Sequence, residues 1–283
     1  MLSVKAKTYN LHLSITKYSY SIPCKHRIPA KQLMYNRQNL LTMEKIPEHI
    51  SHLRKSDETS NEWQFQSNEE HSAGVARLAS GFADKIGFRD WGHVLGMLHD
   101  KGKEQIEFQR YIRKASGYMP EISSMGKTPH AYVGALMARQ LYPQIFPLLS
   151  MPIMAHHAGL YDSTDFDERM KAEIPAGIQS ENCVDLEMPR GKTYQPQDFH
   201  HLVRVLYSCL VDADFLDTEA FMDKPRSESR KNLKSIQELL PLLENYLNEL
   251  SENAARSDLN ALRSSIQKGA APLRMSTRKM QGG

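Results

Sequence analysis

Hydrophobic residues recur at helical spacing over most of the chain from about residue 46 onward. Between Glu69 and Ile86 an apolar side chain returns every three or four positions, and Gly87 follows where such a helix would end. The same spacing predicts helices over residues 90–98, 131–141, 146–155, 199–216 and 228–250, with a short one around Phe108 and an interruption at Pro241. We find no internal repeat and no persuasive strand. The pattern therefore predicts an all-α fold, a bundle of helices.

The two ends of the chain lack this periodicity and are strongly basic. Residues 1–42 hold seven Lys or Arg and no acidic residue, and residues 259–283 hold five Lys or Arg and again no acidic residue. Residues 43–258 therefore carry 24 of the 36 basic residues against all 33 acidic residues, a net charge of −9. We predict a flexible basic extension over 1–42, one domain over 43–250 and a linker-like basic tail over 251–283. Basic tails are usually solvated, so they do not by themselves indicate a nucleic-acid partner.

The overall composition is that of an ordinary globular protein. Of the 283 residues, 40% are hydrophobic and 24% are charged. No apolar run approaches the roughly 20 residues that a membrane-spanning helix needs, so no membrane partner is expected. The three cysteines, Cys24, Cys183 and Cys209, are far apart and form no C-x-x-C motif. This pattern argues against a disulfide framework or a thiolate zinc site and favours a reducing compartment, so we expect a cytoplasmic protein.

The candidate chemistry lies in histidines and aspartates placed on or beside the predicted helices. His99-Asp100 ends one apolar helical run, and a neutral imidazole next to a carboxylate is a suitable pair of metal ligands. Each such residue taken alone is more often structural than functional. They recur, however, on five predicted helices: His71, His99-Asp100, His130, His156-His157 and Asp214. Their joint occurrence predicts one metal centre between the helices.

These residues can be divided into two ligand sets that share Asp100. His71, His99, Asp100 and Asp214 would hold one ion, and Asp100, His130, His156 and His157 would hold a second. Two such ions can activate water and neutralise charge on a phosphate ester. Imidazole-rich ligation favours Mn, Fe, Co, Ni or Zn over Mg, which prefers oxygen ligands. We expect Asp100 to bridge the ions and Lys103, one helical turn beyond His99, to direct its ammonium at a phosphate oxygen.

Other polar residues near these positions receive lesser roles. Asp212 points away from Asp214 on a helix, so it is predicted to support the site or to cap the helix. His200 and His201 lie in the polar first turn of their helix and are predicted to be a surface pair.

Several motifs together resemble the HD nuclease domain of the CRISPR-associated nuclease–helicase of type I systems. The similarity extends over roughly residues 46–265. It is carried by His52, Glu70-His71, Leu98-His99-Asp100-Lys101-Gly102-Lys103 with Phe108-Gln109, His130-Ala131-Tyr132-Val133-Gly134-Ala135, His156-His157-Ala158-Gly159-Leu160 and Leu210-Val211-Asp212-Ala213-Asp214-Phe215-Leu216-Asp217-Thr218-Glu219. The last two segments are more diagnostic than the His-Asp pair, which is common to all HD phosphohydrolases.

The resemblance implies an HD-domain helical bundle that cleaves single-stranded DNA in antiviral defence. The substrate would be the strand displaced when a guide RNA pairs with its target, and the partners would be a CRISPR surveillance complex and a helicase. The family's metal ligands carry over to His71, His99, Asp100, His130, His156, His157 and Asp214, with Lys103 beside the metals, whereas the matching His52 receives no role. The sequence departs from the family at Pro129, where Asp is frequent, and at Ala158, where glycine is usual.

The helicase's phosphate-binding loop, G-x-x-x-x-G-K-[ST], does not occur in the sequence. We therefore expect the helicase to be a separate chain or to be missing by truncation. Two alternatives remain open beside the nuclease. One is an HD phosphohydrolase that acts on a nucleotide, which would ignore single-stranded DNA. The other is a truncated docking fragment without catalytic activity, against which the full set of ligands argues.

Overall fold

The computed structural model describes residues 21–22, 46–57, 61–178, 184–189, 195–230, 234–266 and 269. These residues belong to two compact units, which divide between Ser227 and Glu228. The boundary that we predicted at residue 250 lies inside a helix of the second unit. Apart from Ser21 and Ile22, the predicted basic extension over 1–42 lies outside the described residues.

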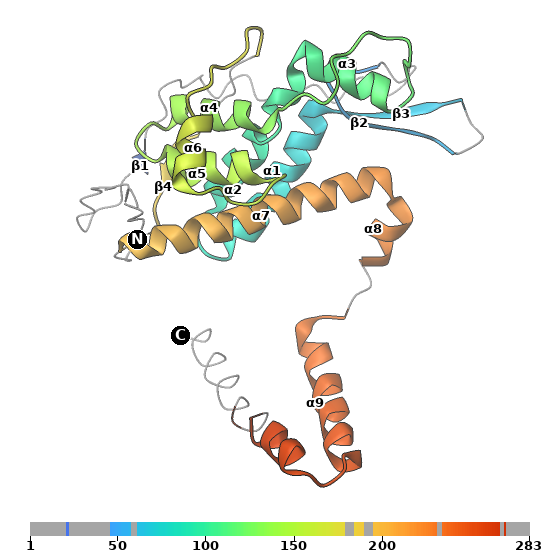
Figure 1. Ribbon diagram of the computed structural model, residues 1–283, viewed down its shortest axis with the longest axis vertical. Helices are drawn as coiled ribbons and strands as arrows, with labels where there is room; N and C mark the ends of the chain where they lie inside the picture. The colour runs from blue at the N-terminus through green and yellow to red at the C-terminus, as the bar shows by residue number, and fades with distance from the viewer. Residues whose placement is uncertain are drawn as a thin grey trace, which may run out of the picture. The chain divides into compact units, whose positions relative to one another are not determined.

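The first unit is mostly helical, as the hydrophobic pattern predicts (Figure 1). Its helices are α1 (Asn68–Asp84), α2 (Arg89–Leu98), a 3₁₀ turn (Lys101–Glu104), α3 (Ile106–Ala115), α4 (Ala131–Leu141), α5 (Phe146–Ala155), α6 (Ser163–Arg169) and α7 (Pro196–Met222). The short helix α8 (Lys224–Arg230) follows α7 across the division between the units.

Two short antiparallel strand pairs accompany the helices, although we expected no strand. Strands β2 (Ile50–Lys55) and β3 (Trp63–Ser67) form a hairpin with a bulge between Ile50 and His52, and β1 (Ser21–Ile22) pairs with β4 (Leu186–Glu187). Every residue of β3 is half-buried, because both faces of the hairpin are partly covered. Strand β3 does alternate apolar and polar residues, but only over five positions, and β2 shows no such alternation, which explains why the pattern did not reveal the hairpin.

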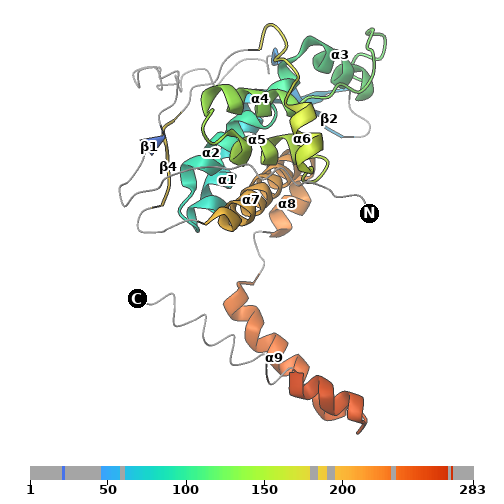
Figure 2. The same cartoon turned by 60° about the vertical axis from the view of Figure 1, so that its left-hand side comes forward.

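The core of the first unit lies between α1, α2, α4, α5 and α7. Helix α1 packs against α2 and α7, α4 packs against α5, and α5 also contacts α7. Both views show α7 running along one side of the other core helices (Figures 1 and 2). The largest fully buried side chains include Trp91, Leu95, Leu136, Leu149 and Leu206. Each core helix other than α1 therefore contributes at least one large buried side chain. Helix α1 contributes smaller residues, Val75, Ala76 and Ala79 among them, which lets its neighbours approach closely.

The second unit contains helix α9 (Ile236–Asn253) and a further helical stretch over 258–266. Helix α9 begins at an N-cap, Ser235, whose side chain accepts a hydrogen bond from Glu238 N. We predicted one helix over 228–250 with an interruption at Pro241, but α9 starts later and continues through Pro241. The predicted linker-like tail over 251–283 is helical in part of its described stretch.

No helix in the described part of the chain is both long enough and apolar enough to span a membrane.

The close contact of α1 and α2 depends on Gly96. A Cβ atom at this position would lie 2.3 Å from both Cα and N of Ala76, which is backbone and cannot turn away. We therefore expect Gly96→Ala to lower the free energy of unfolding by about 1–3 kcal/mol through overpacking. The matched control is Gly81→Ala on the exposed face of α1, where a Cβ meets nothing within 4 Å. This variant should raise that free energy by about 0.5–1 kcal/mol. Urea unfolding measures both, and equal stabilities would contradict the prediction.

Candidate metal centre

The predicted ligands lie near helix ends, from which they point into one region. His71 lies in the first turn of α1, and His99 caps the C-terminus of α2. Asp100 follows immediately and precedes the 3₁₀ turn, so the chain changes direction at the His-Asp pair. His130 is the N-cap of α4, and His156 caps the C-terminus of α5. Only Asp214 comes from the interior of a helix, α7.

Helix α1 begins at a defined residue, which determines the direction of His71. The Ser67 side chain accepts a hydrogen bond from Glu70 N, and the Glu70 carboxylate accepts one from Ser67 N, so the two form a capping box. His71 is therefore on the buried face of α1, one turn before Val75.

The structure brings all seven predicted ligands together in two groups with a shared member. In each group the candidate ligand atoms lie within 4.8 Å of one another; the groups are His71, His99, Asp100 and Asp214, and Asp100, His130, His156 and His157. These are the two sets into which we divided the residues from the sequence. The geometry thus agrees with that division.

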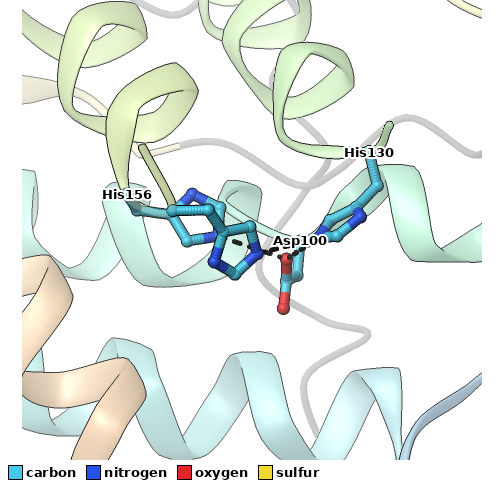
Figure 3. Close-up of side chains that lie close together, drawn as sticks. Asp100, His130 and His156 are labelled. Atoms are coloured by element: carbon cyan, nitrogen blue, oxygen red, sulfur yellow. Dashed lines mark hydrogen bonds and ion pairs between the residues drawn. The ribbon is translucent and has the colours of Figure 1, made fainter. Parts of the chain in front are cut away.

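Asp100 presents a different oxygen to each group. Its Oδ2 lies 3.4 Å from His71 Nε2 and 3.2 Å from His99 Nε2. Its Oδ1 lies 3.4 Å from His130 Nε2 and 3.5 Å from His156 Nε2. Figure 3 shows His130 and His156 approaching this carboxylate from two different helices. A single carboxylate is therefore in position to bridge two ions.

Four of the five histidines are oriented by hydrogen bonds through Nδ1. His71 Nδ1 lies 2.8 Å from Asp217 Oδ2, and the others lie near backbone carbonyl oxygens: His99 near Gly96 O (2.8 Å), His130 near Thr128 O (3.3 Å) and His156 near Ile153 O (2.6 Å). Carbonyl and carboxylate oxygens only accept, so in each case Nδ1–H donates. The Nε2 atoms are left facing the centre, which is the arrangement of metal-binding histidines.

The donor atoms at the centre fit a cation better than they fit one another. His71 Nε2 lies 3.3 Å from His99 Nε2, and His130 Nε2 lies 2.9 Å from His157 Nε2. Two nitrogens that each carry a lone pair repel at such a distance unless a proton or a metal ion lies between them. Moreover, among the described residues, Asp100 Oδ1 and His156 Nε2 are buried without a hydrogen-bond partner. Buried groups of this kind need a compensating charge, and a divalent cation supplies one.

The charges at the site depend strongly on one another. Burial alone would lower the pKa of His71, but its bonds to Asp100, Asp214 and Asp217 outweigh burial and raise the pKa to about 10. The pKa of His99 rises to about 9 in the same way, because Asp100 outweighs burial. Histidines that are protonated in the absence of a cation release those protons when a metal binds. Protons and metal ions therefore compete for the same nitrogens.

The pKa of Asp100 lies well below its ordinary value, although burial acts to raise it. The charge of Lys103 is the main cause of the lowering, followed by that of His99. At the exposed edge of the site, burial and the neighbouring His156 lower the pKa of His157 to about 4. Asp100 is therefore a carboxylate and His157 a neutral imidazole near neutral pH, the forms in which they bind metals.

Lys103 is held differently from our expectation. It lies in the 3₁₀ turn and is buried, with Nζ 2.7 Å from Asp100 Oδ2 and 2.9 Å from Ser51 Oγ. We predicted an ammonium directed at a substrate phosphate, whereas in the structure it is directed at the shared carboxylate.

His71 is supported by a residue to which we gave no role from the sequence. Asp217 lies one turn beyond Asp214 on α7, and its Oδ2 accepts hydrogen bonds from His71 Nδ1 and Gln66 Nε2, both at 2.8 Å. We predicted a supporting or capping role for Asp212, but its side chain is exposed on the other side of the helix. The spacing of three residues from Asp214 would have indicated Asp217, because residues i and i+3 share a helix face. His200 and His201 are exposed, as predicted.

Part of the chain matches a known protein family. Residues 68–185 match the model of the family described as HD domain. An HD domain is therefore found in this chain. HD domains are generally metal-dependent phosphohydrolases, and the His/Asp groups are of a kind that binds divalent metals. The match includes the group of Asp100, His130, His156 and His157, whereas Asp214 and the hairpin lie outside it. No curated protein matches the chain.

The contact between His71 and Asp217 can be tested by metal titration. Asp217→Ala removes the acceptor that fixes the ring of His71. We therefore expect the affinity of this variant for Mn²⁺ to be about 10–100-fold lower than that of the wild type, the usual effect of losing such a partner. Asp212→Ala removes an equal charge from the exposed side of the same helix and should leave the affinity almost unchanged. Isothermal titration calorimetry measures both. Equal losses in the two variants would show that only the net charge of α7 matters.

Proposed function

We propose that this chain is a metal-dependent nuclease that hydrolyses phosphodiester bonds of single-stranded DNA in type I CRISPR interference. The observation that carries the hydrolytic part is the carboxylate of Asp100, with one oxygen facing each of two ligand groups. We assign His71, His99, Asp100 and Asp214 to one ion and Asp100, His130, His156 and His157 to the other. Two divalent ions held in this way supply an activated water and offset the charge that develops on a phosphate.

The residues of the chain contribute position and charge to this chemistry. The Nδ1 hydrogen bonds hold four imidazole rings with Nε2 inward, so little reorganisation is needed when the ligands bind. The site is open on one side, where His157 is exposed and the side chains of Asp214 and His130 are 18% and 12% exposed. A phosphodiester would approach from this side, because His71, His99 and Asp100 are buried.

The choice of DNA and of CRISPR interference rests on sequence motifs. The segments around His156-His157 and Asp212-Ala213-Asp214 resemble the type I nuclease beyond what HD phosphohydrolases share. On the same grounds we propose a surveillance complex and a helicase as partners, and the cytoplasm as the location. The metals proposed are Mn, Fe, Co or Ni, with Mg less favoured by the imidazole-rich ligands.

Cleavage of single-stranded DNA tests this proposal directly. The chain is incubated with a labelled oligonucleotide and Mn²⁺, Ni²⁺, Co²⁺ or Mg²⁺, beside Asp100→Ala and, as a control, His200→Ala in the exposed first turn of α7. We expect metal-dependent cleavage that falls at least about 100-fold in Asp100→Ala, more than the loss of a supporting residue causes, and that His200→Ala retains.

Two results would count against the nuclease. Hydrolysis of nucleotides without cleavage of DNA would favour the alternative HD phosphohydrolase. A folded protein that binds metal and hydrolyses neither substrate would favour the docking fragment.

Lys103→Met separates metal binding from catalysis. The ammonium lies 2.7 Å from Asp100 Oδ2 and repels cations at that carboxylate. Its removal should therefore leave the Mn²⁺ affinity equal or higher. Cations bound at Asp100 would repel the ammonium from that carboxylate, and we expect it then to turn toward the substrate phosphate. The cleavage rate of Lys103→Met should therefore fall by about 10²–10³, the usual effect of losing one electrostatic contact to the transition state. Calorimetry and initial rates at saturating Mn²⁺ provide the two measurements, and loss of Mn²⁺ binding would show that Lys103 only stabilises the folded site.

A further inference from the structure

One face of the β2–β3 hairpin lies against the last turns of α7, beside the candidate metal centre. The cross-strand pairs His52–Gln66 and Arg54–Gln64 share this face, because alternate residues of a strand point to the same side. Arg54 Nη1 donates a hydrogen bond to Met222 O near the end of α7, 3.2 Å away. The hairpin is therefore attached to the helix that carries Asp214 and Asp217, although none of these elements belongs to the matched HD segment.

A continuous path of hydrogen bonds leads from His52 to His71. His52 Nδ1 lies 2.9 Å from Gln66 Oε1, which only accepts, so Nδ1–H donates. The amide nitrogen of Gln66 donates in turn to Asp217 Oδ2 at 2.8 Å, and this same oxygen accepts from His71 Nδ1 at 2.8 Å. The rings of His52 and His71 are also in edge contact, with centroids 4.6 Å apart and an interplanar angle of 87°.

A second, longer path leads from His52 to Asp214. His52 Nε2 lies 3.5 Å from Thr218 Oγ1, and Thr218 Oγ1 lies 3.4 Å from Asp214 Oδ1. The hydroxyl has a single proton, so at any moment it donates to only one of these neighbours. This path is weaker than the path through Gln66, because its distances exceed those of good hydrogen bonds.

We propose that His52 is a positioning residue for one of the two metal positions, the one formed by His71, His99, Asp100 and Asp214. Acting mainly through Gln66 and Asp217, it fixes the ring of His71, and its edge contact limits the rotation of that ring. His52 is not itself a ligand, since its nitrogens belong to neither of the two ligand groups in the described part of the chain. The inference rests on the proposed function in that the group must bind a metal.

The proposal predicts an asymmetric effect on metal binding. The group of Asp100, His130, His156 and His157 shares only Asp100 with the first group, and the hydrogen bonds that orient its rings come from Thr128 and Ile153. Loss of His52 should therefore weaken one of two bound ions and leave the other in place. A general loss of folding would instead weaken both.

The experiment uses Mn²⁺ alone as the probe, without DNA. Calorimetry gives the number and affinity of bound ions, and electron paramagnetic resonance distinguishes a coupled Mn²⁺ pair from an isolated ion. In His52→Ala we expect one ion to bind about 10-fold more weakly, the lower end of the range for supporting residues, and the coupled signal to be replaced by that of an isolated ion. Gln64→Ala is the matched control, since Gln64 is on the same hairpin face as His52 but its side chain, among the described residues, accepts hydrogen bonds from Arg54 and makes none to the path that leads to His71.

Two conservative variants test whether His52 acts through its hydrogen bond to Gln66. Asparagine places an amide N–H near the position of Nδ1, so His52→Asn can still donate to Gln66 and should restore the affinity to within about 3-fold of wild type, well below the effect of losing the partner. Glutamine places its amide near the position of Nε2, and His52→Gln should behave like His52→Ala. Circular dichroism establishes that each variant is folded. If His52→Ala does not fold, the comparison of His52→Asn with His52→Gln still tests the proposal.

The possible outcomes separate this inference from the proposed function. Weak binding of one ion in His52→Ala, with rescue by His52→Asn, supports the positioning role. Unchanged binding in His52→Ala, equal loss of both ions, or no rescue by His52→Asn overturns it, whatever the DNA assay shows. A wild-type protein that binds two Mn²⁺ ions but leaves single-stranded DNA intact would refute the nuclease and leave the role of His52 standing.

Discussion

The arrangement of the first unit depends on one buried carboxylate, that of Asp100. A charge removed from water is costly unless opposite charges or hydrogen bonds compensate it. Asp100 is fully buried, and four histidine Nε2 atoms together with Lys103 Nζ lie around its two oxygens. These groups come from α1, α2, the 3₁₀ turn, α4 and α5, so the helices must meet at this point for the carboxylate to be compensated. The need to compensate the charge of Asp100 thus constrains both the packing of the helices and the arrangement of the candidate ligands.

The histidines of the site differ in which groups orient their rings. Within the matched HD segment, His99 and His156 are oriented by carbonyl oxygens of their own helices, so the local backbone conformation is enough to direct them. His71 is directed by Asp217 of α7, which is itself bonded to Gln66 of the hairpin. One ligand group therefore depends on distant segments and the other mainly on local ones. This difference is the physical basis for expecting the two metal positions to respond separately to substitutions in the hairpin.

Much of the fold and of the candidate site was visible in the sequence, but not all of it. The apolar pattern located α1, α2, α4 and α5 closely, because α1 and α2 bury one apolar face, while α4 and α5 are mostly apolar and are buried over most of their length. The hairpin was missed, since the alternation in β3 extends over only five residues and β2 shows none. Lys103 was expected to face a substrate, yet helical spacing could not show that a 3₁₀ turn directs its ammonium at Asp100. The division of the chain into two units near residue 227 was also not visible in the sequence, because periodicity predicts that a segment is helical but not which segments it packs against.

By itself, the sequence determined which residue types were available and on which local elements they lie. The positions of His71, His99-Asp100, His130, His156-His157 and Asp214 relative to helix ends follow from short-range rules of periodicity and capping, so they could be derived without a structure. Only the tertiary structure decided that one oxygen of Asp100 faces each ligand group, and that Asp217 rather than Asp212 orients His71. The rotation of α7 and the approach of the hairpin result from packing between segments some 150 residues apart. Contacts at that separation are set by the whole core, and no local pattern encodes them.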